Sequence, residues 1–406
     1  MASHGVARSA RRELTAQEKA KELKQIDKYK DLVSQVRERY YAKDYSSPAL
    51  TLTSALLTSN PEYYTIWNYR RQILLSVFTS ELASASPPSP SSESVPSDVP
   101  SLTTAQQEIS LLIREDLAFL LPLQRYNPKV YWLWNHRSWL LSQATLHLPP
   151  AVAKGFWKEE LGLVEKMLGR DERNFHGWGY RREVVRNLEE LSYRQLSEAD
   201  TARAEPIEGG TPQPGTQHSA PEQETAWRKQ ASMAQQEFDY ADRMIRSNLS
   251  NFSAWHHRLQ QIYRLLEDLP SDHARRKEMF DAELELVSEG LWVCTGPKDQ
   301  SLWFYHMDLM STLDPGVAEG RKILGDIGDE ERRGYVKRQM ERVREVGEDN
   351  EDCKWIYQAL LDLGQLHSKF GGEVDEPEMR GLLDKLEMLD PLRKGRWTDL
   401  RRSLGL

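Results

Sequence analysis

Apolar residues recur along this chain at steps of three and four, the spacing that places side chains on one face of an α-helix. Two clear stripes are Trp157, Leu161, Val164 and Leu168, and Phe280, Leu284, Val287 and Leu291. No segment alternates convincingly between apolar and polar residues with period two, so we expect no β-strands. The pattern predicts an all-helical protein.

A turn signal and a second helix follow each stripe. The clearest turn signals are Asn60-Pro61 and Asn127-Pro128, which we interpret as helix starts, with Asn as cap and Pro at the first helical position. The second helix carries a signature in which Trp stands three residues after an aromatic residue and three before a basic one. Its copies run Tyr64–Arg70, Tyr131–Arg137, Phe175–Arg181 and Phe252–Arg258, and a fifth, imperfect copy runs Gln300–His306. The signature's aromatic and Trp share one helix face, so we expect both to pack against the next repeat.

The signature tryptophans recur with a regular period once two inserts are removed. Trp67, Trp134, Trp178, Trp255 and Trp303 lie 67, 44, 77 and 48 residues apart. Both long steps contain Pro, Ser, Gly and Glu mixtures, near 84–100 and 198–224, which bury too little apolar surface to fold. Without about 20–30 residues for each, every step becomes about 44–48, typical of two-helix repeats. Two degenerate copies surround Trp355 and Trp397.

The predicted fold is therefore a right-handed superhelical α-solenoid of helical hairpins, similar to tetratricopeptide arrays. We assign residues 1–45 to an N-terminal tail and a capping helix, which begins at the capping box Thr15-x-x-Glu18. Residues 46–406 form the solenoid, with five clear repeats to about residue 310 and two degenerate ones, and with disordered inserts near 84–100 and 198–224.

Composition narrows the class of function. A net charge of −8 argues against nucleic acid as the main ligand. The two cysteines, Cys294 and Cys353, fit a reducing compartment and provide neither a disulfide framework nor a metal site. The N-terminus lacks the apolar run of a signal peptide, and no apolar stretch is long enough to span a bilayer. We expect a soluble cytoplasmic protein.

The sequences of the repeats resemble those of a known family. The copies NPEYYTIWNYRR, NPKVYWLWNHRSWLL, DERNFHGWGYRR, NFSAWHHR and DQSLWFYH look like the repeats of protein prenyltransferase α subunits, over about Asn60 to Met310. Within the family, DERNFH, DQSLWFYH and an early His4-Gly5 are similar to the α subunits of Rab (type II) geranylgeranyltransferases. There is no room for the immunoglobulin-like and leucine-rich additions of some animal members, so the chain resembles the short fungal type.

The resemblance implies an obligate heterodimer. Its partner would be a β subunit that holds the lipid cavity and the catalytic Zn²⁺, and this chain itself has no Asp, Cys and His cluster at ligand spacing. An escort protein would present Rab GTPases, and geranylgeranyl diphosphate would react with their C-terminal cysteines to form thioethers.

Four residues are candidates for the site. Lys129, placed in the first turn of a predicted helix, combines an ammonium with the positive end of the helix dipole, and the resemblance implies that it reaches the diphosphate. The resemblance also places Tyr131 at the mouth of the active site, although core packing is the default for its slot. His176, unique at its repeat position, would help line the diphosphate and peptide site. Asn174 is a weaker candidate because it also fits a helix start.

The remaining hypotheses concern the N-terminus and the recurring basic residues. In the family a free N-terminal segment folds back and places a histidine on the partner's zinc, which makes His4 a possible autoinhibitory ligand. The arginines recur with the period, so we expect a structural role, bracing helix ends or pairing with acidic neighbours; they are Arg70, Arg137, Arg181 and Arg258.

Two alternative functions stay open. The chain could be the shared α subunit of farnesyltransferase and geranylgeranyltransferase type I. It could also be a helical scaffold that binds proteins and performs no chemistry.

Overall fold

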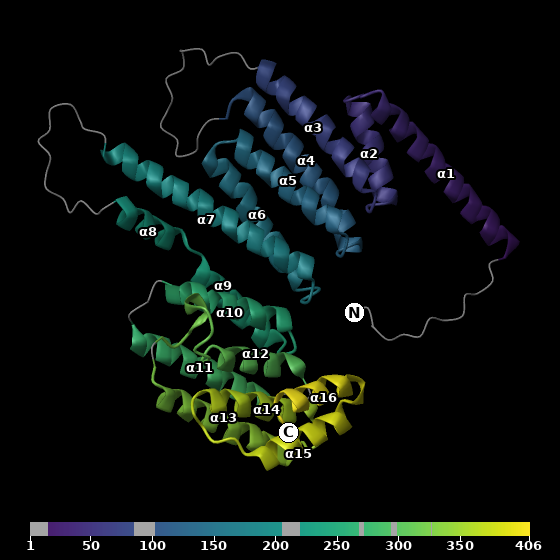
Figure 1. The fold of residues 1–406 in the computed structure, drawn as a ribbon. Coiled ribbons are helices and arrows are strands. Elements are labelled where there is room, and N and C mark those ends of the chain that lie inside the picture. The colour runs from purple at the N-terminus through teal and green to yellow at the C-terminus, as the bar shows by residue number, and fades with distance from the viewer. Residues whose placement is uncertain (1–14, 85–101, 205–219, 268–271, 294–298, 326) are drawn as a thin grey trace, which may run out of the picture. The chain divides into compact units, whose positions relative to one another are not determined.

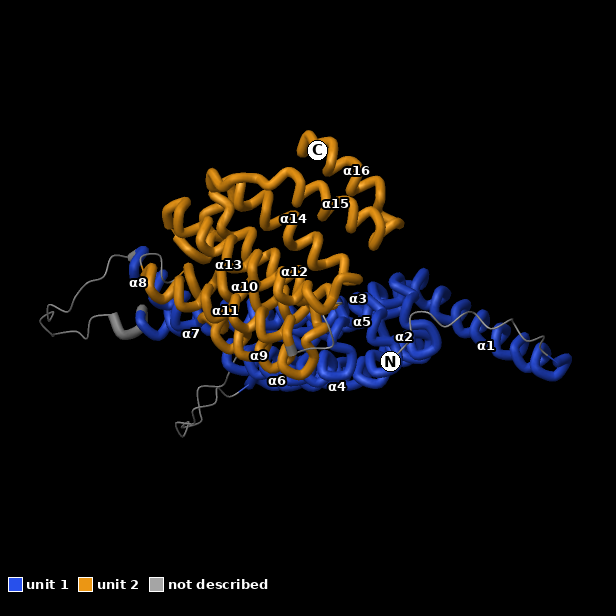
Figure 2. The backbone as a smooth tube through the Cα atoms, turned by 90° about the horizontal axis from the view of Figure 1, so that it is seen from below, with its two compact units in different colours: residues 1–231 blue, residues 232–406 orange. Residues whose placement is uncertain are grey.

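A computed structural model describes residues 15–84, 102–204, 220–267, 272–293, 299–325 and 327–406. The chain divides into two compact units, unit 1 (Met1–Ala231) and unit 2 (Ser232–Leu406), which Figure 2 colours separately. The described ranges contain helices and turns and no β-strand, as the sequence predicts. No helix within them combines the length and apolarity needed to cross a bilayer.

Unit 1 is a row of helical hairpins in which each helix packs against the one before it (Figure 1). Its helices are α1 (Ala16–Tyr41), α2 (Ser47–Ser59), α3 (Tyr64–Ser84), α4 (Thr104–Tyr126), α5 (Tyr131–His147), α6 (Pro150–Leu168), α7 (Phe175–Ala204) and α8 (Ala220–Ala231). The second helices of successive hairpins, α3, α5 and α7, also contact one another. This is the stacking expected of a helical-repeat solenoid.

Unit 2 continues the same plan. Its helices are α9 (Ala234–Ser247), α10 (Phe252–Glu267), α11 (His273–Val293), α12 (Gln300–Ser311), α13 (Asp329–Glu348), α14 (Lys354–Lys369), α15 (Glu376–Leu389) and α16 (Lys394–Ser403), with short 3-10 turns at Glu319–Arg321 and Pro391–Arg393. The two degenerate repeats are helical hairpins, α13–α14 around Trp355 and α15–α16 around Trp397, and both tryptophans are buried.

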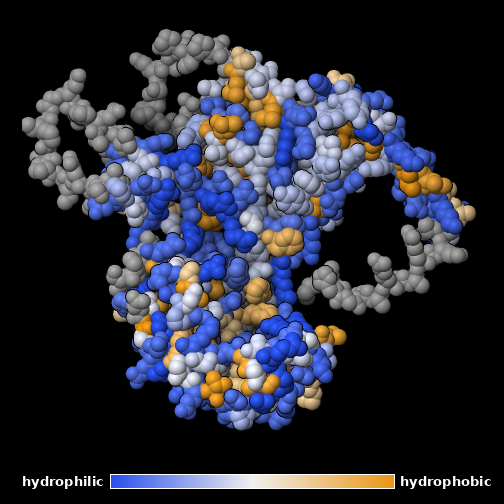
Figure 3. Space-filling view, in the orientation of Figure 1, coloured by the Kyte–Doolittle hydropathy of each residue, from blue (hydrophilic) through white to orange (hydrophobic). Residues whose placement is uncertain are grey.

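The N-terminal helix α1 packs on α2 through its C-terminal part, where Val36 is its one buried residue. The predicted capping box is present, since the Glu18 N–H donates to Thr15 Oγ1 and the Thr15 N–H donates to the Glu18 carboxylate. The N-terminal half of α1 is exposed, and the apolar side chains of Leu23 and Ile26 lie on it. Figure 3 shows hydrophobic surface along the exposed part of this helix.

The boundaries of one predicted insert change. Helix α7 runs to Ala204 and α8 begins at Ala220, so both ends of the segment 198–224 are helical. Helix α8 was not predicted; it is held by Trp227, which packs edge-to-face on Tyr193 of α7 with ring centroids 6.4 Å apart. The middle of this insert lies outside the described residues, as does nearly all of the insert near 84–100.

The interpretation of the Asn-Pro pairs as helix starts is wrong. Asn60 ends α2, donating its N–H to the Leu56 carbonyl oxygen at 2.8 Å, and α3 begins only at Tyr64. Asn127 likewise ends α4, and α5 begins at Tyr131. Each pair instead opens a four-residue turn, for which Asn and Pro are equally suited.

The signature tryptophans are buried, as predicted, and those of the four clear repeats also close the turn before their helix. The indole N–H donates to the backbone carbonyl six residues earlier, at 2.8–2.9 Å in the four clear repeats. The bonds run from Trp67 to Pro61, Trp134 to Pro128, Trp178 to Glu172 and Trp255 to Leu249. A tryptophan therefore fixes the geometry of the turn as well as filling the core.

A buried carboxylate joins consecutive repeats, and we call this arrangement the buried ladder. Each acid comes from a first helix, and accepts hydrogen bonds from the signature arginine of the preceding repeat and from the Tyr or His of its own. The ladder comprises Asp116 with Arg70 and His136, Glu160 with Arg137 and Tyr180, and Glu283 with Arg258 and Tyr305. The predicted pairing of these three arginines with acidic neighbours is confirmed.

Buried ion pairs need this saturation with hydrogen bonds, because a charge removed from water is otherwise destabilising. Burial alone would raise the pKa of Asp116, but the hydrogen bond from His136 and the charge of Arg70 outweigh it and hold that pKa at about 2. The carboxylate therefore stays ionised at neutral pH.

Candidate functional site

Lys129 lies in the turn before α5, and its predicted place in the first turn of a helix is wrong. The turn is closed by the Val130 N–H, which donates to the Asn127 carbonyl oxygen at 3.1 Å, and by the bond from Trp134 to Pro128. The lysine side chain is 61% exposed, with Nζ 3.8 Å from an Asp171 carboxylate oxygen. Exposed ion pairs of this kind are weak, so the ammonium is available to an incoming anion.

Asn174 ties the start of α7 to the turn that carries Lys129. Its buried side chain donates from Nδ2 to the Pro128 carbonyl oxygen at 2.9 Å. Its Oδ1 accepts from the backbone N–H groups of His176 and Gly177, at 3.0 and 3.3 Å. The helix-start role considered for Asn174 is therefore present, together with a contact across the repeat boundary that the sequence analysis did not anticipate.

His176 is the second residue of α7 and lies directly against the Lys129 turn. Burial lowers the pKa of its imidazole, and a hydrogen bond to the backbone of Lys129 and the charge of Glu62 only partly oppose this. The imidazole is therefore neutral at pH 7. The ring centroid of Tyr131 lies 6.0 Å from that of His176.

Aromatic rings form a continuous row over the first residues of α3, α5 and α7, which we call the aromatic rim. Tyr64 stacks on Trp132 with centroids 5.4 Å apart, Trp132 contacts Tyr131 at 5.2 Å, and Tyr131 leads to His176. Phe175 completes the row, 4.0 Å from His176. Sequence reasoning had singled out neither Tyr64 nor Trp132 for this site, because each repeat was considered separately.

The expectation that the signature's first aromatic packs in the core is wrong. Tyr64, Tyr131, Phe175 and Phe252 are 55, 51, 69 and 41% exposed. Each is the first residue of its helix, so its side chain lies beyond the layer that the tryptophans and arginines fill. Those of unit 1 belong to the aromatic rim, and exposed aromatic side chains gathered in one row are typical of binding surfaces.

The structure thus brings Lys129, Tyr131, Asn174 and His176 together on one edge of unit 1. His4 lies outside the described residues. Within the described ranges no group of three or more His, Cys, Asp or Glu side chains is arranged to hold a metal.

Sequence reasoning missed the carboxylates of the buried ladder, although a signal was present. Asp116 and Glu160 each precede the tryptophan of their own repeat by 18 residues, as does Glu237, and Glu283 precedes its tryptophan by 20. Glu237 accepts from His257 at 3.0 Å, which completes the set of first-helix acids. An acid recurring at this offset would have identified the partners of the arginines.

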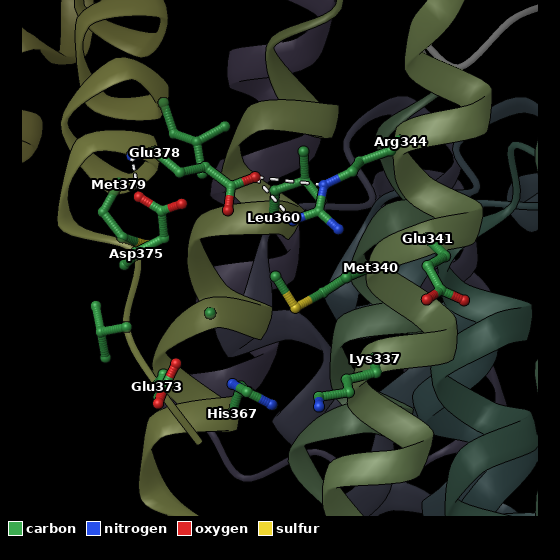
Figure 4. Close-up of a pocket in the computed structure, with 13 residues that line it drawn as sticks. Lys337, Met340, Glu341, Arg344, Leu360, His367, Glu373, Asp375, Glu378 and Met379 are labelled. Carbon is green, nitrogen blue, oxygen red and sulfur yellow. Dashed lines mark hydrogen bonds and ion pairs between the residues drawn. The ribbon is translucent and has the colours of Figure 1, made fainter. Parts of the chain in front are cut away.

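Unit 2 contains a separate pocket of about 290 Å³ between α13, α14 and the start of α15 (Figure 4). Its charges have both signs, and Arg344 and Glu378 pair at 2.8 Å. Lys337, His367 and Glu373 also line it, over an apolar floor that includes Leu360. None of the candidate residues lies in this pocket.

The comparisons with known proteins first define a class. The model of the protein prenyltransferase alpha subunit repeat matches residues 47–77, 113–144, 157–188 and 234–265. A solved structure, Candida albicans protein geranylgeranyltransferase-I complexed with GGPP, matches with a TM-score of 0.52 at 19% identity, over 93% of this chain and 90% of that one. Fold and repeats together define a protein prenyltransferase α subunit.

Sequence relatives then identify the family. The geranylgeranyl transferase type-2 subunit alpha of Saccharomyces cerevisiae is 31% identical over 98% of both chains. That of Schizosaccharomyces pombe is 30% identical over 99% of this chain and 98% of its own. The human protein matches at 30% over 74% of this chain but only 40% of its own length. The chain belongs to the family of type-2 geranylgeranyl transferase α subunits, and the resemblance to the short fungal type is confirmed.

Proposed function

We propose that this chain, with a β subunit, forms a cytoplasmic type-2 geranylgeranyltransferase that modifies the C-terminal cysteines of Rab GTPases presented by an escort protein. The donor is geranylgeranyl diphosphate. One observation carries the site assignment: a cationic turn, a phenol and a neutral imidazole meet on one exposed edge, held by Asn174 and Trp134. The family relationship supports the reaction type.

In this reaction a cysteine sulfur forms a bond to C1 of the isoprenoid while the C1–O bond breaks, and the thiol proton leaves to solvent. Negative charge grows on the departing diphosphate. The Lys129 ammonium pairs with that charge, and Tyr131 donates its hydroxyl hydrogen to the same oxygens. The imidazole of His176 lines the diphosphate and holds the backbone of Lys129. Zn²⁺, which we assign to the β subunit, supplies activation of the thiol.

The aromatic rim is the surface that we propose for docking the β subunit. Interfaces are enriched in aromatic anchors that bury large areas at low entropic cost. The rim surrounds the candidate residues, so docking there would enclose the site and exclude water from the ion pair between Lys129 and the diphosphate.

The substitution Lys129→Ala in the heterodimer tests the function. We expect kcat for escorted Rab to fall by about 10²–10³, the usual consequence of losing one donor to developing negative charge, with assembly unchanged. Lys158→Ala, at an exposed position of α6, is the matched control and should leave kcat unaltered. Unchanged turnover in Lys129→Ala would favour the alternative of a scaffold without chemistry.

The choice of acceptor separates the proposed function from the farnesyltransferase and type I alternative. We expect the heterodimer to modify Rab with its escort protein and to leave peptides ending in a CaaX sequence unmodified. Efficient transfer to such peptides would contradict the proposal.

His4 remains our prediction for autoinhibition. Neutral imidazole is a common zinc ligand, so an N-terminal segment reaching the β subunit's zinc would compete with the substrate thiol. Deleting residues 1–5 should then raise turnover at low Rab concentration. Equal turnover and equal zinc coordination after the deletion would end the hypothesis.

A further inference from the structure

We infer that Arg71 and Asn135 are positioning residues that orient the Tyr131 hydroxyl toward the diphosphate. The inference rests on the proposed function, because it assigns a task to Tyr131 in that reaction. It adds a contribution from the preceding repeat, since Arg71 belongs to α3 and Tyr131 to α5.

The contacts form a short chain across the repeat boundary. Arg71 Nη2 donates to both the side-chain oxygen and the backbone oxygen of Asn135, at 2.7 and 3.0 Å. Asn135 Nδ2 in turn donates to the Tyr131 hydroxyl oxygen at 3.3 Å. The Arg71 guanidinium also lies over the Trp139 ring, 5.4 Å from its centroid. Two bonds to one asparagine and a ring beneath it leave the guanidinium little freedom.

The direction of each bond follows from the chemistry of the groups. A guanidinium has donors only, so the Asn135 oxygen must face Arg71 and its NH₂ group must face Tyr131. The Tyr131 oxygen therefore accepts, and its hydrogen has no acceptor within unit 1 as described. The phenol is left with a donor directed outward, which is the polarity that a departing diphosphate requires.

The buried ladder anchors the other end of this chain. Arg71 Nε donates to His136 Nδ1 at 3.3 Å, so His136 must carry its hydrogen on Nε2, which donates to Asp116 at 2.7 Å. His136 is fully buried and Asp116 almost so. A contact with the buried core thus fixes the position of Arg71. Arg71 in turn fixes Asn135, and Asn135 orients the exposed Tyr131 side chain.

The third repeat offers a matched comparison. Arg182 occupies the place of Arg71 in the next Arg-Arg doublet. Its side chain is exposed, and in the described part of unit 1 it donates no comparable pair of hydrogen bonds. An Arg-Arg doublet alone therefore does not create the positioning role. The role depends on Asn135 and Tyr131, which lie in α5, the signature helix of the next repeat.

The test measures kcat and KM of the heterodimer for escorted Rab in a double-mutant cycle. Tyr131→Phe should lower kcat about 10- to 100-fold, the range of one hydrogen bond to a charged group, with KM nearly unchanged. Asn135→Leu and Arg71→Met should each lower kcat about threefold to tenfold, because the hydroxyl stays but loses its orientation. Combining Asn135→Leu with Tyr131→Phe should lower kcat no further than Tyr131→Phe alone, because both remove the same oriented hydroxyl.

Controls separate the possible failures. Arg182→Met should leave kcat unaltered, and Asn135→Leu keeps the test valid if Arg71→Met impairs assembly. Multiplicative losses in the double variant, or normal kcat in Asn135→Leu, would overturn the inference while leaving the proposed function intact. A wild-type heterodimer without activity on escorted Rab would instead refute the proposed function.

Discussion

The second and fourth signature helices, α5 and α10, share one interior and carry different exposed ends. In both helices, Trp closes the preceding turn, and His forms a hydrogen bond with the acid of the first helix in its own repeat. Arg pairs with the acid of the next repeat. The α5 set is Trp134, His136 and Arg137, and the α10 set is Trp255, His257 and Arg258.

The ends of these helices differ in chemistry. Before α5 the turn presents Lys129 with an exposed ammonium, whereas the same turn position before α10 holds Ser250, which contacts Asp299. The first helical residue is Tyr131 in one and Phe252 in the other, so only the first offers a hydroxyl. Repeats with the same buried interior therefore differ in function through the turn and the first residues of the signature helix.

The largest expected effect concerns the ladder. Arg137→Met should destabilise the chain by about 3–5 kcal/mol, because it leaves the Glu160 carboxylate buried beside Tyr180 without its cation. Arg258→Met should have an effect of the same size through Glu283. Urea denaturation of the heterodimer, followed by circular dichroism, measures both.

A compensating substitution checks the cause of that destabilisation. Arg137→Met combined with Glu160→Met should recover much of the lost stability, because apolar groups replace both charges. Unchanged denaturation midpoints in either single variant would show that the ladder contributes little to the fold.

The next effect concerns the exposed end of α7. His176→Ala should lower kcat about 10- to 100-fold, since it removes a hydrogen-bonding group beside the diphosphate and releases the Lys129 backbone. Ser253→Ala, at the same position of α10, is the control and should leave kcat unaltered. Equal losses in both variants would mean that the helix start, and not the imidazole, is what matters.

The sequence predicted what is local and periodic. The hairpins, the tryptophan core and the arginine pairing follow from spacing, because residues three and four apart share a helix face. The exposure of Tyr131 did not follow from spacing, since periodicity gives a face and not the distance from the helix end. Asn127-Pro128 was predicted to start a helix but follows the end of one, because Asn suits a helix end and a helix start alike.

The convergence of Lys129, Asn174 and His176 also required the structure. It depends on the packing of α5 against α7, through a hydrogen bond from Asn174 to Pro128 that spans 46 residues of chain. The family resemblance pointed to these residues one by one, but only their contacts show how a turn in one repeat is held by the next.

A smaller effect distinguishes the two functions of the tryptophans. Trp134→Phe and Trp255→Phe should each destabilise the chain by about 2–3 kcal/mol, because the indole hydrogen bond is lost and the smaller ring leaves a cavity in the core. Only Trp134→Phe should also lower kcat, because its turn carries Lys129. Thermal melting and steady-state turnover of the two heterodimers check this pair, and an equal kcat in both would show that the Lys129 turn holds its shape without the indole.

The last effect, which is absent at neutral pH, concerns the fifth repeat, where the ladder is incomplete. In the fifth repeat His306 replaces the arginine, and its Nε2 pairs with the neutral Gln339 at 2.9 Å. Burial lowers the pKa of His306 to about 4, despite the opposing hydrogen bond that its imidazole donates to the Gln339 side-chain oxygen. A lowered pKa means that the unfolded chain takes up a proton before the folded one does, so stability is complete above about pH 6.5 and declines as the pH falls toward 4.

His306→Gln removes this titration while keeping a side chain that hydrogen-bonds to Gln339. The melting temperature of the wild type should therefore fall more steeply between pH 6.5 and 4 than that of His306→Gln, with the two curves parallel above pH 7. His273→Gln, at an exposed position, is the control and should follow the wild type. Parallel curves over the whole range would show that His306 binds its proton equally in both states.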